Sequence, residues 1–302
     1  MDTLNPASVV SDAQVAEYRE KGFIVVEDIF SADDLKQMDD ALNGLIAEAR
    51  DLTEHTNVID LEPSHTPERP RVRRIKEPFL NHPVFNEMAK RPKLVAALTA
   101  LIGPNLRMHG SKINLKSAEY GSPVEWHQDW AFYPHTNDDV LAVGVMLDDM
   151  TDDNGPLLCI PGSHTGPTYD HHQDGHFVGA IDPESSGIDF NTAEKITGKA
   201  GSCSFHHVRM MHGSGQNTSG KDRRLLLFQV AAADAWDIRG MDRIGSWEQY
   251  KKTMIAGEPT NEPRVVVTPI RLPYPEPLKK GSIYESQTLV KNKYFGSKPA
   301  AE

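Results

Sequence analysis

The sequence predicts a mainly β domain with flanking α helices, either a β-sandwich or a jelly roll buttressed by N-terminal helices. Signals for helices concentrate before residue 102, whereas apolar runs of strand length dominate from Leu106 onward. No internal repeat, low-complexity segment or Pro/Gly-rich linker divides the 302 residues. We therefore expect a single domain over residues 1–302.

Three helices are predicted in the first hundred residues, each from its own start signal. The first N–H groups of a helix lack intrahelical partners, so a capping side chain or a proline is favoured there. Ser11 with Gln14 three residues later, and Ser31 before an acidic turn, match the capping case. Pro92 matches the proline case, and Gly22 is expected to end the first helix.

Runs rich in β-branched and apolar residues predict the strands. The clearest runs are 23–26, 106–117, 140–147, 157–160, 202–208 and 224–232. The polar, Pro-rich segment 53–78 is expected to form a loop followed by a short strand. Asn154-Gly155 predicts a hairpin turn. Residues 165–200 are expected to form a loop insertion over one end of the barrel, and 270–302 a tail with few periodic features.

Composition disfavours several classes of function. The formal net charge of −11 argues against non-specific binding of nucleic acid or of an anionic membrane surface. Only two cysteines occur, Cys159 and Cys203, so no disulfide framework is implied and a reducing compartment is favoured. No apolar run approaches the roughly 20 residues of a membrane span, and no secretory signal is visible. We expect a cytoplasmic protein, whose oligomeric state the sequence leaves unknown.

The most informative motif is His127-Gln128-Asp129, which places an imidazole and a carboxylate two residues apart. On a β-strand both side chains point to one face, because successive residues alternate. With a second imidazole from a distant strand, for which His212 is the candidate, they form a 2-His-1-carboxylate set. Such a set binds Fe(II) on one face and leaves the opposite positions open for substrate and O2.

Other histidines compete for these roles. The triplet His-Gln-Asp recurs at 172–174, but there it lies in a polar, glycine-containing stretch that is expected to be a solvated loop. The first copy instead leads into an apolar run. His206 and His207 compete with His212 for the second imidazole, and either can be a structural strand histidine. The Gly-Ser that follows His212 favours His212 as the second imidazole of the set.

These residues belong to an ordered series of motifs. The series comprises His127-Gln128-Asp129, Asn154-Gly155-Pro156-Leu157, Ile160-Pro161-Gly162-Ser163-His164, and His212-Gly213-Ser214 followed by Asn217, Ser219 and Arg223. It closely resembles the phytanoyl-CoA dioxygenase family of Fe(II)/2-oxoglutarate oxygenases, over roughly residues 12–235. The resemblance implies a double-stranded β-helix, the cupin-like jelly roll, with Fe(II) bound by His127, Asp129 and His212. It also implies 2-oxoglutarate and O2 as co-substrates.

The resemblance extends to residues for the co-substrate. Arg223 stands where the family places an arginine for the far carboxylate, and its planar fork suits that group, although a surface arginine paired with an acid is the alternative. Ser214 would add a hydroxyl. Lys112 matches a basic residue of ectoine hydroxylase, a family member, and whether Lys112 or Lys116 faces the site is open. Gln128 is used near the co-substrate in relatives, but on an ideal strand it points away from the metal.

The implied reaction hydroxylates an aliphatic C–H of a small molecule and releases succinate and CO2. The carboxylate of Asp129 favours this outcome over halogenation, because related halogenases carry a small residue there. The residues expected near the substrate are Trp130, Phe132, Tyr133 and Arg73. The basic run 69–76 that contains the arginine is either a solvated face or a binding site for an anionic group. Rival hypotheses are an inactive cupin-like metal-binding or sensor protein and a non-oxidative metalloenzyme such as an isomerase, in which Arg223 has no obvious purpose.

Overall fold

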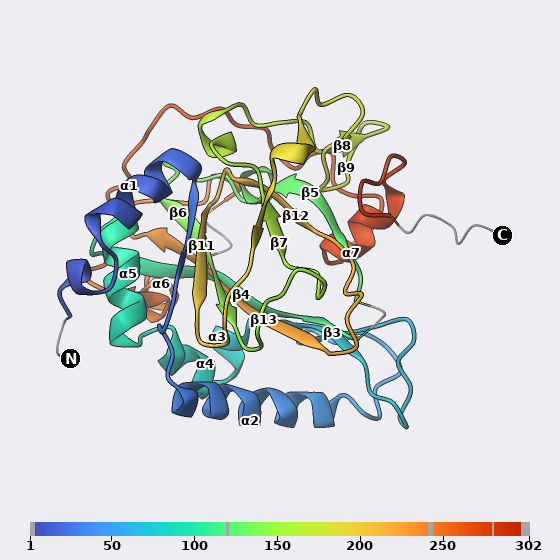
Figure 1. The fold of residues 1–302 in the computed structure, drawn as a ribbon. Helices are drawn as coiled ribbons and strands as arrows, with labels where there is room; N and C mark the ends of the chain where they lie inside the picture. The colour runs from blue at the N-terminus through green and yellow to red at the C-terminus, as the bar shows by residue number, and fades with distance from the viewer. Residues whose placement is uncertain (1–3, 119–120, 241–243, 280, 297–302) are drawn as a thin grey trace.

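Two antiparallel sheets face each other in this computed structural model, which describes residues 4–118, 121–240, 244–279 and 281–296 (Figure 1). The large sheet has the order β1-β11-β6-β13-β4-β3-β2, with β14 paired to β4, and the small sheet has the order β10-β7-β12-β5. The strands of the large sheet are β1 (Phe23–Val26), β2 (Ile59–Leu61), β3 (Val72–Lys76), β4 (Leu106–Lys116), β6 (Val140–Met146), β11 (Cys203–His207), β13 (Arg223–Ala232) and β14 (Met254–Ala256). Those of the small sheet are β5 (Val124–Gln128), β7 (Leu157–Cys159), β10 (Glu194–Ile196) and β12 (Met211–Ser214). Two facing sheets with flanking helices confirm the predicted mainly β jelly roll.

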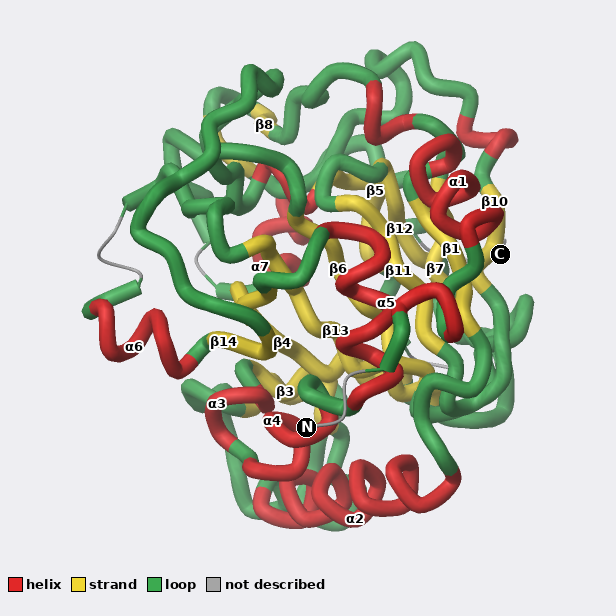
Figure 2. Tube along the Cα trace, turned by 90° about the vertical axis from the view of Figure 1, so that its left-hand side faces the viewer, coloured by secondary structure: helices red, strands yellow, loops and turns green. Residues whose placement is uncertain are grey.

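Helices flank the two sheets, and one of them covers the outer face of the large sheet. The helices are α1 (Asp12–Lys21), α2 (Ala32–Glu48), α3 (Pro78–Asn81), α4 (Pro83–Met88), α5 (Pro92–Ile102), α6 (Trp247–Lys252) and α7 (Ile283–Ser286). Figure 2 shows α5 lying across β6 and β13, and the apolar face of α5 shares one buried cluster with the sheet residues Ile113, Val143 and Phe228. Full burial of each such side chain stabilises the fold by about 1.5–3 kcal/mol. Because the outward positions are apolar, the alternate, inward positions are free to carry polar groups.

The predicted helix starts are confirmed by their caps. Ser11 and Gln14 form a capping box, and Ser31 forms one with Asp34. Gly22 ends α1 in the left-handed conformation, with φ of 84°. The strand predictions hold to within one or two residues at each end. Segment 53–78 contains two strands rather than one, and the short helices α3, α4, α6 and α7 were not predicted, because segments of four to six residues are too short to show helical periodicity.

Asn154-Gly155 does not form the predicted hairpin. It connects β6 to β7, which lie in different sheets and pair with other strands. Gly155 has a φ of +72°, and a Cβ there would lie 2.8 Å from the Gly215 carbonyl oxygen and 3.0 Å from Lys116 Cδ. The Asn-Gly pair was predicted as a hairpin because it supplies positive φ, but here the same conformation carries the chain from one sheet to the other.

The expected loop insertion and the expected tail both contain short secondary-structure elements. Residues 165–200 contain the small hairpin β8 (His172–Gln173) and β9 (His176–Phe177), besides β10 and the 3-10 turn Phe190–Thr192. The C-terminal segment forms α7 and the 3-10 turn Gln287–Leu289, and Gln287 anchors it to the backbone of Glu125 and Gly179. No helix in the described part of the chain is long and apolar enough to cross a membrane.

Candidate active site

Three side chains gather between the two sheets at the end of β5. His127 on β5 lies directly opposite His212 on β12, and their ring centroids are 4.1 Å apart. Asp129 follows at the first residue of the 3-10 turn Asp129–Ala131, just past the strand end. One ligand atom from each of the three residues lies within 4.8 Å of the other two, and all three side chains are buried. The structure thus brings together the three residues that the sequence analysis selected.

The hydrogen bonds of this cluster leave its metal-binding atoms available. His127 Nδ1 lies 2.8 Å from the Glu125 carbonyl oxygen and His212 Nδ1 lies 2.9 Å from that of Met210, so each Nδ1–H donates to the backbone. Each Nε2 then keeps its lone pair for a metal. Burial lowers the pKa of both histidines. Burial raises the pKa of Asp129, but Lys112 and the two histidines outweigh it and hold that pKa below its usual range. Two neutral imidazoles and one carboxylate fit Fe(II).

The competing histidines lie elsewhere. His172 and His176 bond backbone carbonyl oxygens of residues 274 and 276. His171, expected as part of a solvated loop, is buried instead and accepts a hydrogen bond from the Gln128 backbone N–H, which fixes the strand beside His127. His206 lines the cavity behind Asp129, whereas His207 points to the other face of β11.

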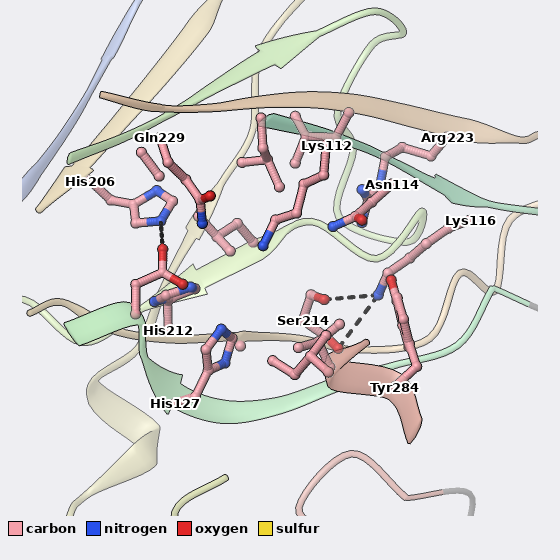
Figure 3. A pocket seen from close by; sticks show the side chains of 18 residues that line it. Lys112, Asn114, Lys116, His127, His206, His212, Ser214, Arg223, Gln229 and Tyr284 are labelled. Carbon is pink, nitrogen blue, oxygen red and sulfur yellow. Dashed lines mark hydrogen bonds and ion pairs between the residues drawn. The ribbon is translucent and has the colours of Figure 1, made fainter. Parts of the chain in front are cut away.

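A cavity extends from the metal set along the inner face of the large sheet (Figure 3). The register between β4 and β13 pairs Lys112 with Leu227, Asn114 with Leu225 and Lys116 with Arg223, and all six line the cavity. Both lysines therefore face the site, which resolves the alternative left open by the sequence. Asn114 lies between them, and β4 is an inner strand of the sheet, between β13 and β3.

The far end of the cavity holds two buried cations. Arg223 is 2% exposed and donates to the carbonyl oxygens of Gly155 and, at 3.5 Å, Asn154. Lys116 donates to Ser214 Oγ at 2.9 Å and to the Gly215 carbonyl oxygen. Neither cation forms an ion pair within the described parts of the chain. Buried cations without a counter-ion are costly, so this end is suited to bind a carboxylate.

These cations also influence each other electrostatically. Burial lowers the pKa of Arg223 to about 10, which leaves it charged at neutral pH. Burial holds the pKa of Lys116 well below its usual value, and the positive charge of the nearby Arg223 lowers it further. A bound dianion would favour the charged form of the lysine.

Gln128 and Trp130 do not reach the cavity. Gln128 Nε2 donates to the Pro167 and Arg209 carbonyl oxygens and its Oε1 accepts from the Tyr169 N–H, on the side of β5 away from the metal set. Trp130 is fully buried, and its Nε1 donates to the Pro269 carbonyl oxygen. Strand alternation explains the first placement, since Gln128 lies between two inward-facing residues.

A second, larger cavity opens on the outer side of Asp129. Phe132 and Tyr133 line it, as does Arg74. The residues shared with the inner cavity are Lys112, Asp129, Gln229 and Ile283, which we call the junction. The sequence analysis selected Arg73 instead of Arg74. In the structure Arg74 pairs in register with the inward-facing Asn114, which places its side chain on the cavity face.

Arg73 contacts the C-terminal segment instead. It forms an ion pair with Glu285 and lies 4.6 Å from the ring centroid of Tyr284. Ile283 and Tyr284 of α7 line the inner cavity. No strand or long helix signals this segment in the sequence, so its contribution to the site could not be predicted.

The family model for phytanoyl-CoA dioxygenase matches residues 18–225, which include the metal set and Arg223. The chain belongs to the phytanoyl-CoA dioxygenase family. This dioxygenase is 37% identical over 286 residues to a probable alpha-ketoglutarate-dependent hypophosphite dioxygenase of Stutzerimonas stutzeri, covering 93% of this chain and 99% of the relative. It is 30% identical over 227 residues to an ectoine dioxygenase of Sphingopyxis alaskensis, covering 69% and 71% of the two chains.

Solved structures agree with this assignment. The crystal structure of EctD from S. alaskensis with 2-oxoglutarate and 5-hydroxyectoine superimposes with a TM-score of 0.66 at 26% identity, over 89% of this chain and 88% of that one. The same protein with bound Fe gives a TM-score of 0.65. The predicted double-stranded β-helix and the prediction of an Fe(II)- and 2-oxoglutarate-dependent dioxygenase are therefore confirmed.

Replacing Arg73 with alanine is expected to raise the KM of this dioxygenase for 2-oxoglutarate several-fold. The change removes a partly buried ion pair, worth about 1 kcal/mol, that holds the α7 wall against the cavity. Steady-state succinate formation at varied 2-oxoglutarate measures the effect. Arg69→Ala, an exposed arginine of the same basic run, is the control and should leave KM unchanged. Equal KM values in both variants would contradict a role for this ion pair.

The metal-free enzyme is expected to lose stability in mild acid. Burial lowers the pKa to about 3 for His135 and His206 and to about 4 for His171 and His207. Unfolded histidine titrates near 6.5, so below that pH the unfolded chain binds more protons and the free energy of unfolding falls. We expect a loss of about 2 kcal/mol per buried histidine between pH 7 and pH 5. Urea unfolding across this range measures it, and an unfolding free energy that does not change with pH would refute the expectation.

Proposed function

We propose that this dioxygenase oxidises a small anion at Fe(II) held by His127, Asp129 and His212, and that hypophosphite is the first substrate to test. The observation that supports an anion is the pair of cations Lys112, at the junction, and Arg74, near it in the outer cavity. The Lys112 ammonium forms no hydrogen bond with the described residues, and neither does Arg74 Nε. Both side chains line the outer cavity together with the carboxylate of Glu77, and a substrate anion beside the metal set would meet these two cations.

The name of the relative from S. stutzeri supports hypophosphite within that class. The similarity covers almost the full length of both chains, whereas the ectoine dioxygenase from S. alaskensis covers about 70% of each. Oxidation of hypophosphite would replace one P–H bond by P–OH. One atom of O2 enters the product phosphite and the other enters succinate, as 2-oxoglutarate loses CO2.

Fe(II), when bound with 2-oxoglutarate, supplies the activation of O2 that this oxidation needs. The chain's own residues position the reactants. The three side chains that would hold the metal all lie on the small-sheet side of the cavity, opposite the residues of the large sheet that line it. Arg223, Lys116 and Ser214 are placed to bind the far carboxylate of the co-substrate. Leu157, Leu225 and Leu227 line the space between them and exclude water.

A succinate assay with several substrates tests the proposal. The enzyme is loaded anaerobically with Fe(II) and 2-oxoglutarate, then given O2 with hypophosphite, ectoine or L-proline. We expect hypophosphite to stimulate succinate formation most and phosphorus NMR to show phosphite. If ectoine or L-proline stimulates and hypophosphite does not, the substrate is instead a C–H compound, as the sequence analysis predicted.

A lysine variant tests the anion site itself. Lys112→Met should abolish the stimulation by hypophosphite while the visible charge-transfer band of the Fe(II)–2-oxoglutarate chelate remains. Lys252→Met is the matched control, because Lys252 lines the outer cavity but is not part of the junction. Stimulation that survives Lys112→Met, or that Lys252→Met abolishes equally, would contradict binding of the anion at the junction.

A further inference from the structure

His206 is a buried histidine whose ring nitrogens have no partner in the described parts of the chain. It lies on β11, is 2% exposed, and lines the inner cavity. Its register partner is Ala142 on β6, which in turn pairs with Gln229 on β13, so the three form one row that faces the metal set.

The other buried histidines near the site differ in one respect. In His127, His212, His135 and His171, Nδ1 is bonded to the carbonyl oxygen two residues earlier. That local bond satisfies one nitrogen and fixes the tautomer. His206 lacks it, so both of its nitrogens depend on groups inside the cavity. A phenylalanine would fill this buried position without leaving polar atoms unpaired, which indicates that the imidazole has a use there.

The acidic group nearest to His206 is the carboxylate of Asp129. His206 Nε2 lies 4.0 Å from Asp129 Oδ2, and the dashed line in Figure 3 marks the contact. This carboxylate lies beyond the end of β5, where no strand pairing fixes it. Its other side-chain partner is the Tyr133 hydroxyl, which accepts in turn from Gln229 Nε2 at 2.8 Å. A shift of about 1 Å brings the imidazole and the carboxylate within hydrogen-bond range.

We propose that His206 is a positioning residue: its Nε2–H donates to Asp129 Oδ2 and holds the carboxylate in the orientation that binds the metal. The inference rests on the proposed metal set. Carboxylate ligands are generally fixed by such outer partners, whose removal weakens metal binding about 10–100-fold. Tyr133, which interacts with the same carboxylate, would share this role.

The test uses three variants of the full-length chain. His206→Phe removes the donor and keeps the volume, whereas His206→Gln keeps an N–H donor near the position of Nε2. His207→Phe is the matched control, because His207 is the next residue on β11, points to the opposite face and lies 3.9 Å from a different carboxylate, Asp138 Oδ2. Anaerobic titration gives the Fe(II) dissociation constant and the position of the 2-oxoglutarate charge-transfer band. Thermal unfolding of the metal-free variants checks the fold.

We expect His206→Phe to weaken Fe(II) binding about 10–100-fold and to shift the band, with a metal-free Tm at or above the wild-type value. His206→Gln should recover most of the affinity, and His207→Phe should bind like wild type. Wild-type affinity and band in His206→Phe would overturn the proposal, as would an equal loss in His206→Gln or in His207→Phe. Failure of the metal set itself would appear separately, as absent Fe(II) binding in the wild-type protein.

Discussion

Replacing His212 with alanine is expected to abolish Fe(II) binding and to lower turnover by more than about 1,000-fold. The variant leaves one imidazole and one carboxylate, which cannot hold the metal on one face. Because the side chain is buried, the loss of ligand and the loss of packing must be separated. Anaerobic titration with Fe(II), followed by the charge-transfer band with 2-oxoglutarate, measures the first. Thermal unfolding measures the second.

His207→Ala is the control for this variant, because it changes a histidine of the opposite sheet that does not line the cavity. It should retain Fe(II) binding and turnover. If His212→Ala still gave the band while His206→Ala lost it, the second imidazole of the set would be His206. That outcome would require a different metal set from the one whose atoms lie within 4.8 Å.

Replacing Arg223 with alanine is expected to raise the KM for 2-oxoglutarate at least about 100-fold while Fe(II) binding is retained. Among the described residues, the buried guanidinium donates only to backbone carbonyl oxygens, so a bound carboxylate of the co-substrate would supply its counter-charge. Lys116 lies beside it in register and would keep part of the affinity. Isothermal titration of the metal-loaded protein with 2-oxoglutarate measures the binding step directly.

Arg224→Ala tests whether the effect belongs to this arginine alone. Arg224 is the next residue on β13, faces the other side and forms ion pairs with Asp148 and Asp39. It should affect stability and leave 2-oxoglutarate binding unchanged. Tight binding of 2-oxoglutarate to Arg223→Ala would assign the far carboxylate to another residue, with Lys116 the next candidate.

Much of this site could be predicted because its residues follow local rules. Side chains two residues apart on a strand point to the same face, and the sequence shows this spacing directly. It places His127 and Asp129 together, and likewise Lys112 and Lys116 on β4. The helix caps at Ser11 and Ser31 are equally local. The double-stranded β-helix depended on the family resemblance, since strand order joins segments far apart in the chain.

The rest of the site depends on tertiary contacts. Arg73 and Arg74 are adjacent and chemically alike, and only the pairing of β3 with β4 decides which one faces the cavity. Tyr284 belongs to a C-terminal segment whose sequence shows no periodicity. Only the tertiary structure shows that this segment packs against the inner cavity. Asn154-Gly155 has the composition of a hairpin turn, yet the two strands that it connects, β6 and β7, lie in different sheets. The sequence leaves open whether His206 faces inward or outward, and only the structure shows that its ring nitrogens lack a hydrogen-bond partner among the described residues.

The two ends of the inner cavity belong to different sheets. The histidines of the metal set lie on β5 and β12, whereas Arg223 and Lys116 lie on β13 and β4. A dianion that spans the cavity therefore acts as a removable cross-link between the halves of the sandwich. At a hundredfold excess over its dissociation constant, such a ligand adds about 2.7 kcal/mol to the free energy of unfolding. Amide protons of both sheets should then exchange more slowly together, so the supply of co-substrate would control how rigid the enzyme is.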